Sequence, residues 1–236
     1  MTSHTEDPGI STAMLSSETL YMQMLQQTFH DLAMWLRMAQ QHQQHLDTYL
    51  SSQFNIFQYL PTDENALSDY IGMLLDAQGP HGQQHLFHDL FLTYVQTKGL
   101  QIPHAPYTVH REYTANGRID LFLAHEDTAL IIENKPYAGD QRLQLHRYYT
   151  SIKEQFADVA LLYLSRGSDP SAASMPGEFL EQLKRLGKFL TVRYADFSTE
   201  YLRQCYRHCA SEKFRFFLSD FMSFLDTRVA KDTRDG

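Results

Sequence analysis

Two short apolar runs that follow each other closely constrain the fold of this chain most strongly. The first covers residues 118–124 (Arg-Ile-Asp-Leu-Phe-Leu-Ala), and the second covers residues 129–133 (Ala-Leu-Ile-Ile-Glu). Both are rich in residues that favour strands, and residues 115–117 (Ala-Asn-Gly) form a turn signal before the first run. A similar run covers residues 107–114. We therefore expect three neighbouring strands, of which the last two can pair as a hairpin.

Polar and charged side chains occur near the start of the first run and at the end of the second. Asp120 belongs to the first run, and Glu133, Asn134 and Lys135 end the second. Because side chains at i and i+2 of a strand share a face, Glu133 and Lys135 should project together, with Asn134 turned away. If the runs pair, Asp120 joins them. The pattern then offers two oxygen ligands for a divalent cation beside an ammonium group, as in a metal-dependent phosphodiesterase. The alternative is an exposed hairpin with an ordinary Glu–Lys ion pair.

The composition limits the class of protein. The chain has 236 residues, 43% hydrophobic and 13% aromatic content, which is enough for one globular domain with additions. A net charge of −8 argues against a nucleic-acid coat protein, but not against an enzyme with a metal ion and a local basic patch. No apolar run approaches the ~20 residues that a membrane helix needs. Residues 1–17 also lack the features of a signal peptide. We therefore predict a cytoplasmic protein that does not associate with a membrane.

The remaining patterns predict an α/β fold with helical additions at both ends. Residues 1–17 are polar and acidic, and we expect a disordered tail there. Residues 18–53 contain no proline or glycine and carry apolar residues at helical spacing, so we expect a helical extension used for packing or self-association. Residues 54–200 hold the expected core, and residues 201–236 an expected C-terminal helical region.

Within the core, the expected order is helix, helix, three strands, helix and strand, followed by a further helix and strand. The first helix should be capped by Thr62. Residues 159–165 are continuously apolar, as expected of a strand that is buried on both faces. This strand should join the sheet in parallel through a crossover helix that runs from Asp140 to about Phe156.

This arrangement resembles the PD-(D/E)XK nuclease superfamily. Its restriction-endonuclease-like core is an α-β-β-β-α-β unit with a mixed sheet, with Asp on one strand and Glu-x-Lys on the next. Residues 131–141 (Ile-Ile-Glu-Asn-Lys-Pro-Tyr-Ala-Gly-Asp-Gln) and 144–149 (Gln-Leu-His-Arg-Tyr-Tyr) look like one bacterial branch of the superfamily. That branch carries Glu-Asn-Lys, a Gly-Asp-Gln turn and Gln-Leu-x-x-Tyr. An upstream block that begins with Glu64 fits the same branch, and the resemblance covers about residues 55–165.

The resemblance implies a metal centre. Asp120 and Glu133 would be catalytic carboxylates that also bind Mg²⁺ or Mn²⁺, together with Glu64 and the backbone carbonyl of Asn134. Lys135 would orient or deprotonate a water molecule activated by the metal, or stabilise developing negative charge. The alternative for Glu64 is an ordinary first-turn glutamate that is favoured by the helix dipole.

The resemblance also implies residues that line the substrate. Gln144 and Tyr148 are four apart on one helix face and would hold the lysine or a substrate phosphate, with Gln141 on the same face. Arg118 would contribute to a basic patch for phosphates. The alternatives are an ordinary helix surface with a half-buried Tyr148 and an ordinary surface counter-charge at Arg118.

We therefore expect a metal-dependent nuclease that hydrolyses phosphodiester bonds of DNA, in bacterial defence or nucleic-acid turnover, with RNA left open as a substrate. The alternative is a catalytically silent module of the nuclease fold that binds protein or nucleic acid. The helical extensions are candidates for forming a homodimer or for binding a partner protein.

Overall fold

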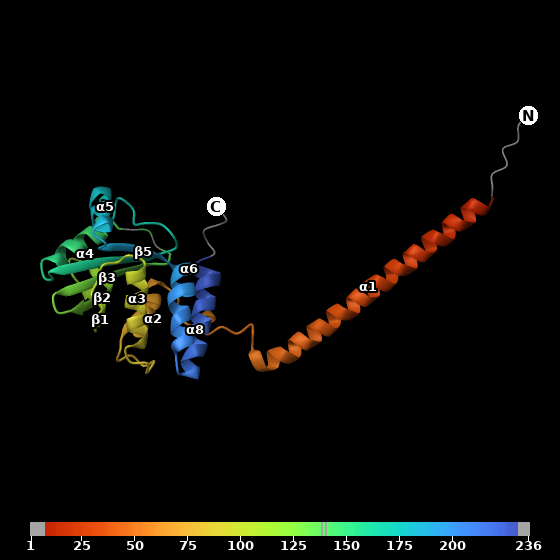
Figure 1. Ribbon diagram of the computed structural model, residues 1–236, viewed down its shortest axis with the longest axis horizontal. Helices are drawn as coiled ribbons and strands as arrows, with labels where there is room; N and C mark the ends of the chain where they lie inside the picture. The colour runs from red at the N-terminus through yellow and green to blue at the C-terminus, as the bar shows by residue number, and fades with distance from the viewer. Residues whose placement is uncertain (1–7, 138, 140, 231–236) are drawn as a thin grey trace, which may run out of the picture. The chain divides into compact units, whose positions relative to one another are not determined.

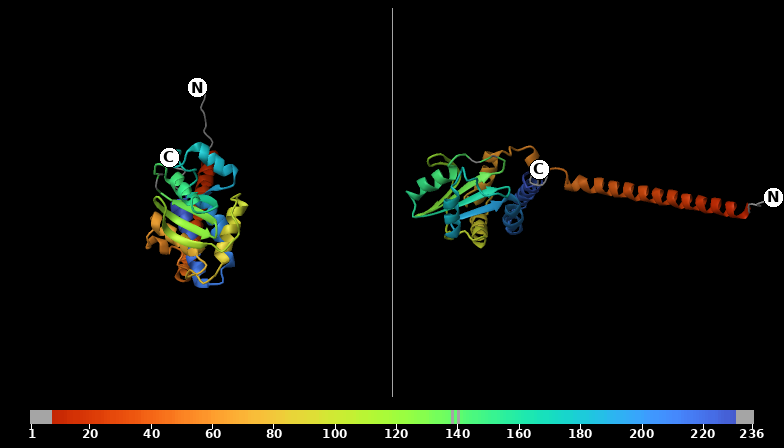
Figure 2. Two further views of the ribbon diagram at one scale, coloured as in Figure 1. Left: turned by 90° about the vertical axis from the view of Figure 1, so that its left-hand side faces the viewer. Right: turned by 90° about the horizontal axis from the view of Figure 1, so that it is seen from above.

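One long helix makes up most of the described part of the N-terminal unit. The computed structural model describes residues 8–137, 139 and 141–230, and the chain divides between Phe54 and Asn55 into two compact units. In the first unit, helix α1 runs without interruption from Pro8 to Leu50 (Figures 1 and 2). The helix ends where Ser51 adopts a left-handed backbone conformation, with a φ of 47°.

The start of α1 differs from the expected disordered tail. Residues 8–17 belong to the helix, whereas residues 1–7 lie outside the described part of the chain. Proline is favoured in the first turn of a helix, where its missing N–H would have no partner. No proline or glycine follows Gly9 within α1, so nothing in the sequence interrupts the helix once it has begun.

The second unit is built around a mixed five-stranded sheet. Its strands follow the order β1-β2-β3-β4-β5, with β1/β2 and β2/β3 antiparallel and β3/β4 and β4/β5 parallel. This topology confirms the expected mixed sheet. The strands are β1 (Thr108–Thr114), β2 (Arg118–His125), β3 (Thr128–Lys135), β4 (Asp158–Ser165) and β5 (Phe189–Arg193).

Helices cover both faces of this sheet (Figure 1). One face bears α2 (Glu64–Leu75), α3 (Leu86–Thr97), α7 (Arg203–His208) and α8 (Glu212–Phe224); the other bears α4 (Gln144–Lys153) and α5 (Gly177–Arg185). Short helical segments cover Ile56–Gln58, Tyr194–Asp196, Phe197–Leu202 and Leu225–Val229. None of the described helices is both long and apolar enough to cross a membrane.

A hydrophobic core lies on each face of the sheet, and strand β3 contributes side chains to both. Leu130 and Ile132 face the core beneath α2 and α3, whereas Ala129 and Ile131 face the core beneath α4. Strand β4, which was predicted to be buried on both faces, divides its side chains in the same way. This double burial is the reason that both strands read as continuous apolar runs rather than as alternating patterns.

Two helix starts differ from the sequence-based expectation. Asp63, not Thr62, caps α2, because its carboxylate accepts a hydrogen bond from the Ala66 N–H at 3.0 Å. Helix α4 begins at Gln144, after Leu143 in a left-handed conformation (φ 52°). The expected start at Asp140 lies outside the described residues.

The C-terminal helices belong to the second unit, which begins at Asn55, rather than to a separate region after residue 200. Leu218 and Phe221 of α8 are completely buried in the core that α2 and α3 share. The start of the unit is bonded to the same helix. Asn55 donates its side-chain N–H to the Asp220 carbonyl at 2.8 Å, and the Ile56 N–H donates to the Asp220 carboxylate at 2.9 Å.

Candidate active site

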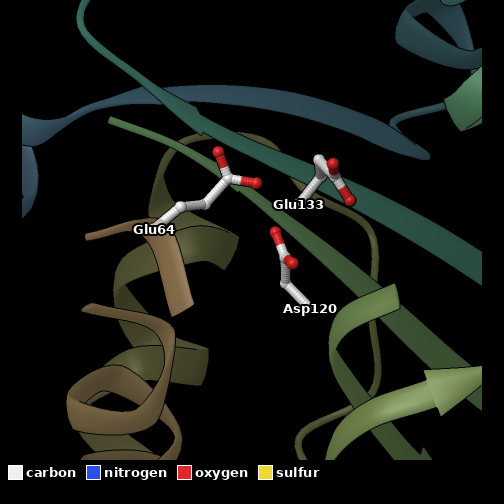
Figure 3. Close-up of side chains that lie close together, drawn as sticks. All are labelled: Glu64, Asp120 and Glu133. Carbon is white, nitrogen blue, oxygen red and sulfur yellow. The ribbon is translucent and has the colours of Figure 1, made fainter. Parts of the chain in front are cut away.

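Three carboxylates converge at the place where β2 and β3 separate. The last residue pair between these strands is Leu121 with Ile132, and Asp120 and Glu133 follow it. Glu64 is the first residue of α2. Figure 3 shows the three side chains pointing toward one another, and one carboxylate oxygen of each lies within 4.8 Å of the other two.

Helix α2 reaches this position because it approaches the sheet closely. A Cβ atom at Gly72 would lie 2.8 Å from a Leu121 methyl group and 2.9 Å from the Arg111 side chain, so any larger residue would require these side chains or the helix to shift. Arg111 of β1 bonds to the helix through the Asp69 carboxylate at 2.7 Å and the Asn65 carbonyl at 3.1 Å. It also donates to the carbonyl of Asp120, which ties α2, β1 and β2 together.

Asn134 holds the two strands and the helix in register. Its backbone N–H donates to Asp120 Oδ2 at 2.9 Å, and its side-chain amide donates to Ser68 Oγ at 2.8 Å and to the Glu64 carbonyl at 3.2 Å. The buried Tyr194 hydroxyl donates to Asn134 Oδ1. The side chain therefore faces α2, as strand alternation predicts, and only the backbone of Asn134 is available to the carboxylate cluster.

Lys135 lies among the carboxylates. Its ammonium group contacts Glu64 Oε1 at 2.7 Å and Glu133 Oε1 at 2.8 Å, and its side chain is only 6% exposed. Glu133 and Lys135 therefore share one face of β3, as expected. The exposed surface ion pair that we considered as the alternative does not describe this arrangement.

Gln144 and Tyr148 form a buried chain of hydrogen bonds behind Glu133. The Gln144 amide donates to Glu133 Oε1 at 2.8 Å and to the Tyr148 hydroxyl at 3.2 Å. Tyr148 in turn donates to the Arg118 carbonyl at 2.7 Å. We expected Gln144 to hold the lysine or a substrate phosphate; in this geometry it holds the carboxylate.

Gln141 and Arg118 lie at the edge of the site. Gln141 precedes α4 and so does not share its face, contrary to our expectation, because the helix begins only at Gln144. The Gln141 backbone N–H donates to Gln144 Oε1 at 3.3 Å, and its side chain is exposed. Arg118 has a 57% exposed side chain and lies 3.2 Å from Glu112 and 3.5 Å from the Asn65 amide oxygen. It is therefore accessible to a ligand near Glu64.

The turn between β1 and β2 brings Tyr148 into place. Gly117 has a φ of 141°, a conformation that side chains rarely adopt, and an added Cβ would lie 2.6 Å from the Tyr148 ring. We expect Gly117→Ala to destabilise the fold by about 2 kcal/mol, because it combines backbone strain with this clash. Chemical denaturation measures the loss. Gly177→Ala is the control, since a Cβ there meets no atom within 4 Å. Equal stability of both variants would contradict this account of the turn.

The carboxylates of the site are buried and lie close to one another, which is unfavourable for their charged forms. Glu133 is fully buried, and its Oε2 atom has no hydrogen-bond partner among the described residues. Burial and the nearby Asp120 carboxylate raise the pKa of Glu133 to about 8, and burial also raises the pKa of Asp120. Burial alone would lower the pKa of Lys135, but the Glu133 and Glu64 carboxylates keep it above its ordinary value.

These observations test whether the residues fit a metal ion. The donors are hard oxygens, three carboxylates are close enough to share one ion, and a buried oxygen of Glu133 lacks a partner. A divalent cation would offset the repulsion between the carboxylates and would use that oxygen. The cluster therefore fits an oxygen-preferring divalent cation, held by Glu64, Asp120 and Glu133.

The mixed sheet, with an acidic residue on β2 and Glu-x-Lys on β3, defines an α/β protein of the restriction-endonuclease-like class. A family model described as the PD-(D/E)XK nuclease superfamily matches residues 54–223, and the chain belongs to that superfamily. The match also includes most of α8, which the sequence-based resemblance did not cover. Comparisons with curated proteins and with solved structures gave no match.

Sequence reasoning missed three residues that position the site. Ser68 lies one helical turn after Glu64, and this spacing was a usable signal. No sequence pattern pointed to Arg111 as the residue that fixes the Asp120 backbone. Tyr194 is separated from Asn134 by 60 positions, and no local pattern predicts this contact.

Proposed function

We propose that this protein is a nuclease that hydrolyses phosphodiester bonds of DNA with Mg²⁺ or Mn²⁺ as cofactor. The convergence of Glu64, Asp120 and Glu133 around the ammonium group of Lys135 carries the proposal. When bound, the cation lowers the pKa of a water molecule and neutralises charge on the scissile phosphate. Membership of a nuclease superfamily supports the same chemistry.

The residues of the chain have separate tasks in this proposal. Asp120 and Glu133 are the catalytic carboxylates and bind the cation together with Glu64 and the Asn134 carbonyl. Lys135 stabilises the negative charge that develops on the phosphate, since it is the cation held inside the cluster. Each role concerns a group that the fold already holds in place, so little reorganisation accompanies the reaction.

The remaining predicted residues support or extend the site. Gln144 and Tyr148 hold the Glu133 carboxylate and act as positioning residues. In this proposal the exposed guanidinium of Arg118 contacts a substrate phosphate, and the exposed side chain of Gln141 also binds the substrate. In-line attack by water leaves a 5′-phosphate and a 3′-hydroxyl. Bacterial defence or nucleic-acid turnover is the proposed setting.

Metal removal tests the proposal directly. Plasmid and single-stranded DNA should be cut in Mg²⁺ or Mn²⁺ and left intact after chelation, and cleavage should return when metal is restored. Asp120→Asn should cut at least about 100-fold more slowly, because the amide is a poorer ligand and places no negative charge beside the cation.

Glu181→Gln is the matched control, because Glu181 is an acidic residue in an exposed ion pair of α5. It should cut at the wild-type rate. Equal cleavage by Asp120→Asn and the wild type would indicate a contaminating nuclease. Failure of the wild type to cut any DNA or RNA, together with no metal at the carboxylates in a Mn²⁺-soaked crystal, would favour the silent binding module instead.

A further inference from the structure

Helix α1 carries an apolar stripe with a heptad spacing. Between residues 22 and 50, apolar residues recur at alternating steps of three and four, which is a mean spacing of 3.5 residues. The stripe consists of Met22, Leu25, Phe29, Leu32, Leu36, Ala39, Gln43, Leu46 and Leu50, in which Gln43 is the one polar member. A strict seven-residue repeat keeps the stripe facing a neighbouring helix only if the two helices wind around each other with a left-handed supercoil.

The stripe is exposed along the helix. Phe29, Leu36 and Leu50 are 67%, 56% and 66% exposed, and most of the other large apolar members are exposed as well. A helix of 43 residues is about 64 Å long at 1.5 Å per residue. The stripe covers 29 of these residues, from Met22 to Leu50, and is therefore about 43 Å long. An exposed and mainly apolar surface of that length marks an interaction site, because helices derive most of their stability in water from packing of such a face.

The residues beside the stripe indicate what covers it. The flanking positions in the region are Gln26, Thr28, Ala33, Trp35, Gln40, His42, Asp47 and Tyr49, of which Asp47 alone carries a charge at neutral pH when histidine is neutral. Charges at these positions normally select a different partner or repel an identical one. Because charges are nearly absent at these positions, the apolar stripe of one helix can pack against the same stripe of an identical helix without repulsion, as a symmetric pair requires.

Gln43 fixes the direction and register of such a pair. In a parallel, in-register pair, Gln43 meets Gln43 of the second copy, and the two amides can bond to each other. In an antiparallel pair centred on Leu36, Gln43 would instead lie beside Phe29 and lose a hydrogen-bond partner.

We infer that residues 22–50 of α1 form a parallel, two-stranded coiled coil with a second copy of this chain. Because each nuclease unit follows the C-terminal end of its own α1, the parallel pairing attaches both units to the same end of the coil. The dimer thus carries two cleavage sites in one particle.

Sedimentation equilibrium of the full chain tests the pairing. The wild type should have twice the chain mass of 27.4 kDa at micromolar concentration. Leu32→Lys/Leu36→Lys should be monomeric, because both residues lie in the stripe. Met34→Lys/Met38→Lys is the matched control: these residues are exposed to 41% and 53%, similar to 53% and 56% for the first pair, but they lie outside the stripe. The control should remain a dimer.

Several outcomes would overturn the inference. They are a monomeric wild type, a mass of three or more chains, or equal dissociation of the two variants, which would point to unspecific apolar contacts. Circular dichroism and the unfolding transition of each variant show whether the nuclease unit remains folded, so dissociation can be separated from misfolding.

Cysteine cross-linking tests the parallel register. Met22→Cys should form a disulfide between the two copies under mild oxidation, because position 22 faces its own equivalent across a parallel seam. Met34→Cys, which faces away from the seam, should not. The native Cys205 and Cys209 are buried, so the wild type provides the background. Cross-linking at position 34 but not at position 22 would overturn the parallel pairing.

Discussion

Lys135→Met should reduce the rate of DNA cleavage by about 10²- to 10³-fold at saturating Mg²⁺, because the variant lacks the positive charge beside the developing phosphate charge. Methionine keeps most of the length and the unbranched apolar stem of lysine but donates no hydrogen bond. Metal should still bind, since all three carboxylates remain. Single-turnover cleavage measures the rate, and titration calorimetry with Mn²⁺ measures the binding.

Lys184→Met is a close control for this variant. Lys184 also contacts two carboxylates, Asp169 at 2.7 Å and Glu181 at 3.0 Å, but it lies on the protein surface in the last turn of α5. Its replacement should leave cleavage unchanged. Wild-type cleavage by Lys135→Met would remove the lysine from the proposed chemistry, and a simultaneous loss of Mn²⁺ binding would show that its role is structural.

Glu133→Gln should have opposite effects on the stability of the metal-free and the metal-bound protein. Without metal, the amide relieves the repulsion with Asp120, yet its oxygen can still accept from Lys135 and Gln144. We therefore expect the free energy of unfolding of the metal-free variant to rise by about 1 kcal/mol, which would raise Tm by about 2–4 °C. With metal, the wild type gains about 2.7 kcal/mol when the free ion exceeds its Kd 100-fold, and the variant should lose most of this gain.

Thermal unfolding with and without Mg²⁺ or Mn²⁺ measures both effects. Glu181→Gln is again the control and should respond to metal as the wild type does. If Glu133→Gln were less stable than the wild type without metal and gained as much from metal, Glu133 would not be a ligand. The cleavage rate of the variant should fall along with its metal response.

The parts of the site that could be predicted from the sequence are the parts that depend on local geometry. Strand alternation alone places Glu133 and Lys135 on one face, and the close spacing of the two runs brings Asp120 beside them. The mixed sheet followed from the three strand-like runs between residues 107 and 133 and from the continuous apolar run of β4. The roles of these residues stay predictions until cleavage and metal binding are measured.

The rest could not be predicted because it depends on contacts between distant parts of the chain. The contact between Tyr194 and Asn134 requires the folded sheet, and the bond from Arg111 to Asp120 requires the register of β1 against β2. Helix α4 begins later than expected because Leu143 adopts a left-handed conformation. Glycine is the usual residue in that conformation, so a leucine at this position gives no signal in the sequence. A leucine in that conformation is held by its surroundings rather than by its own preference.

The hydrogen bonds from Asn55 and Ile56 to Asp220 attach the first residues of the second unit to α8. Whether a shortened chain folds depends on the bonds and the burial of the backbone that is removed. A chain that begins at residue 55 keeps both bonds and should fold, whereas a chain that begins at residue 58 also lacks Phe57, which is buried in the core. The boundary for truncation from the N-terminal side therefore lies at Asn55.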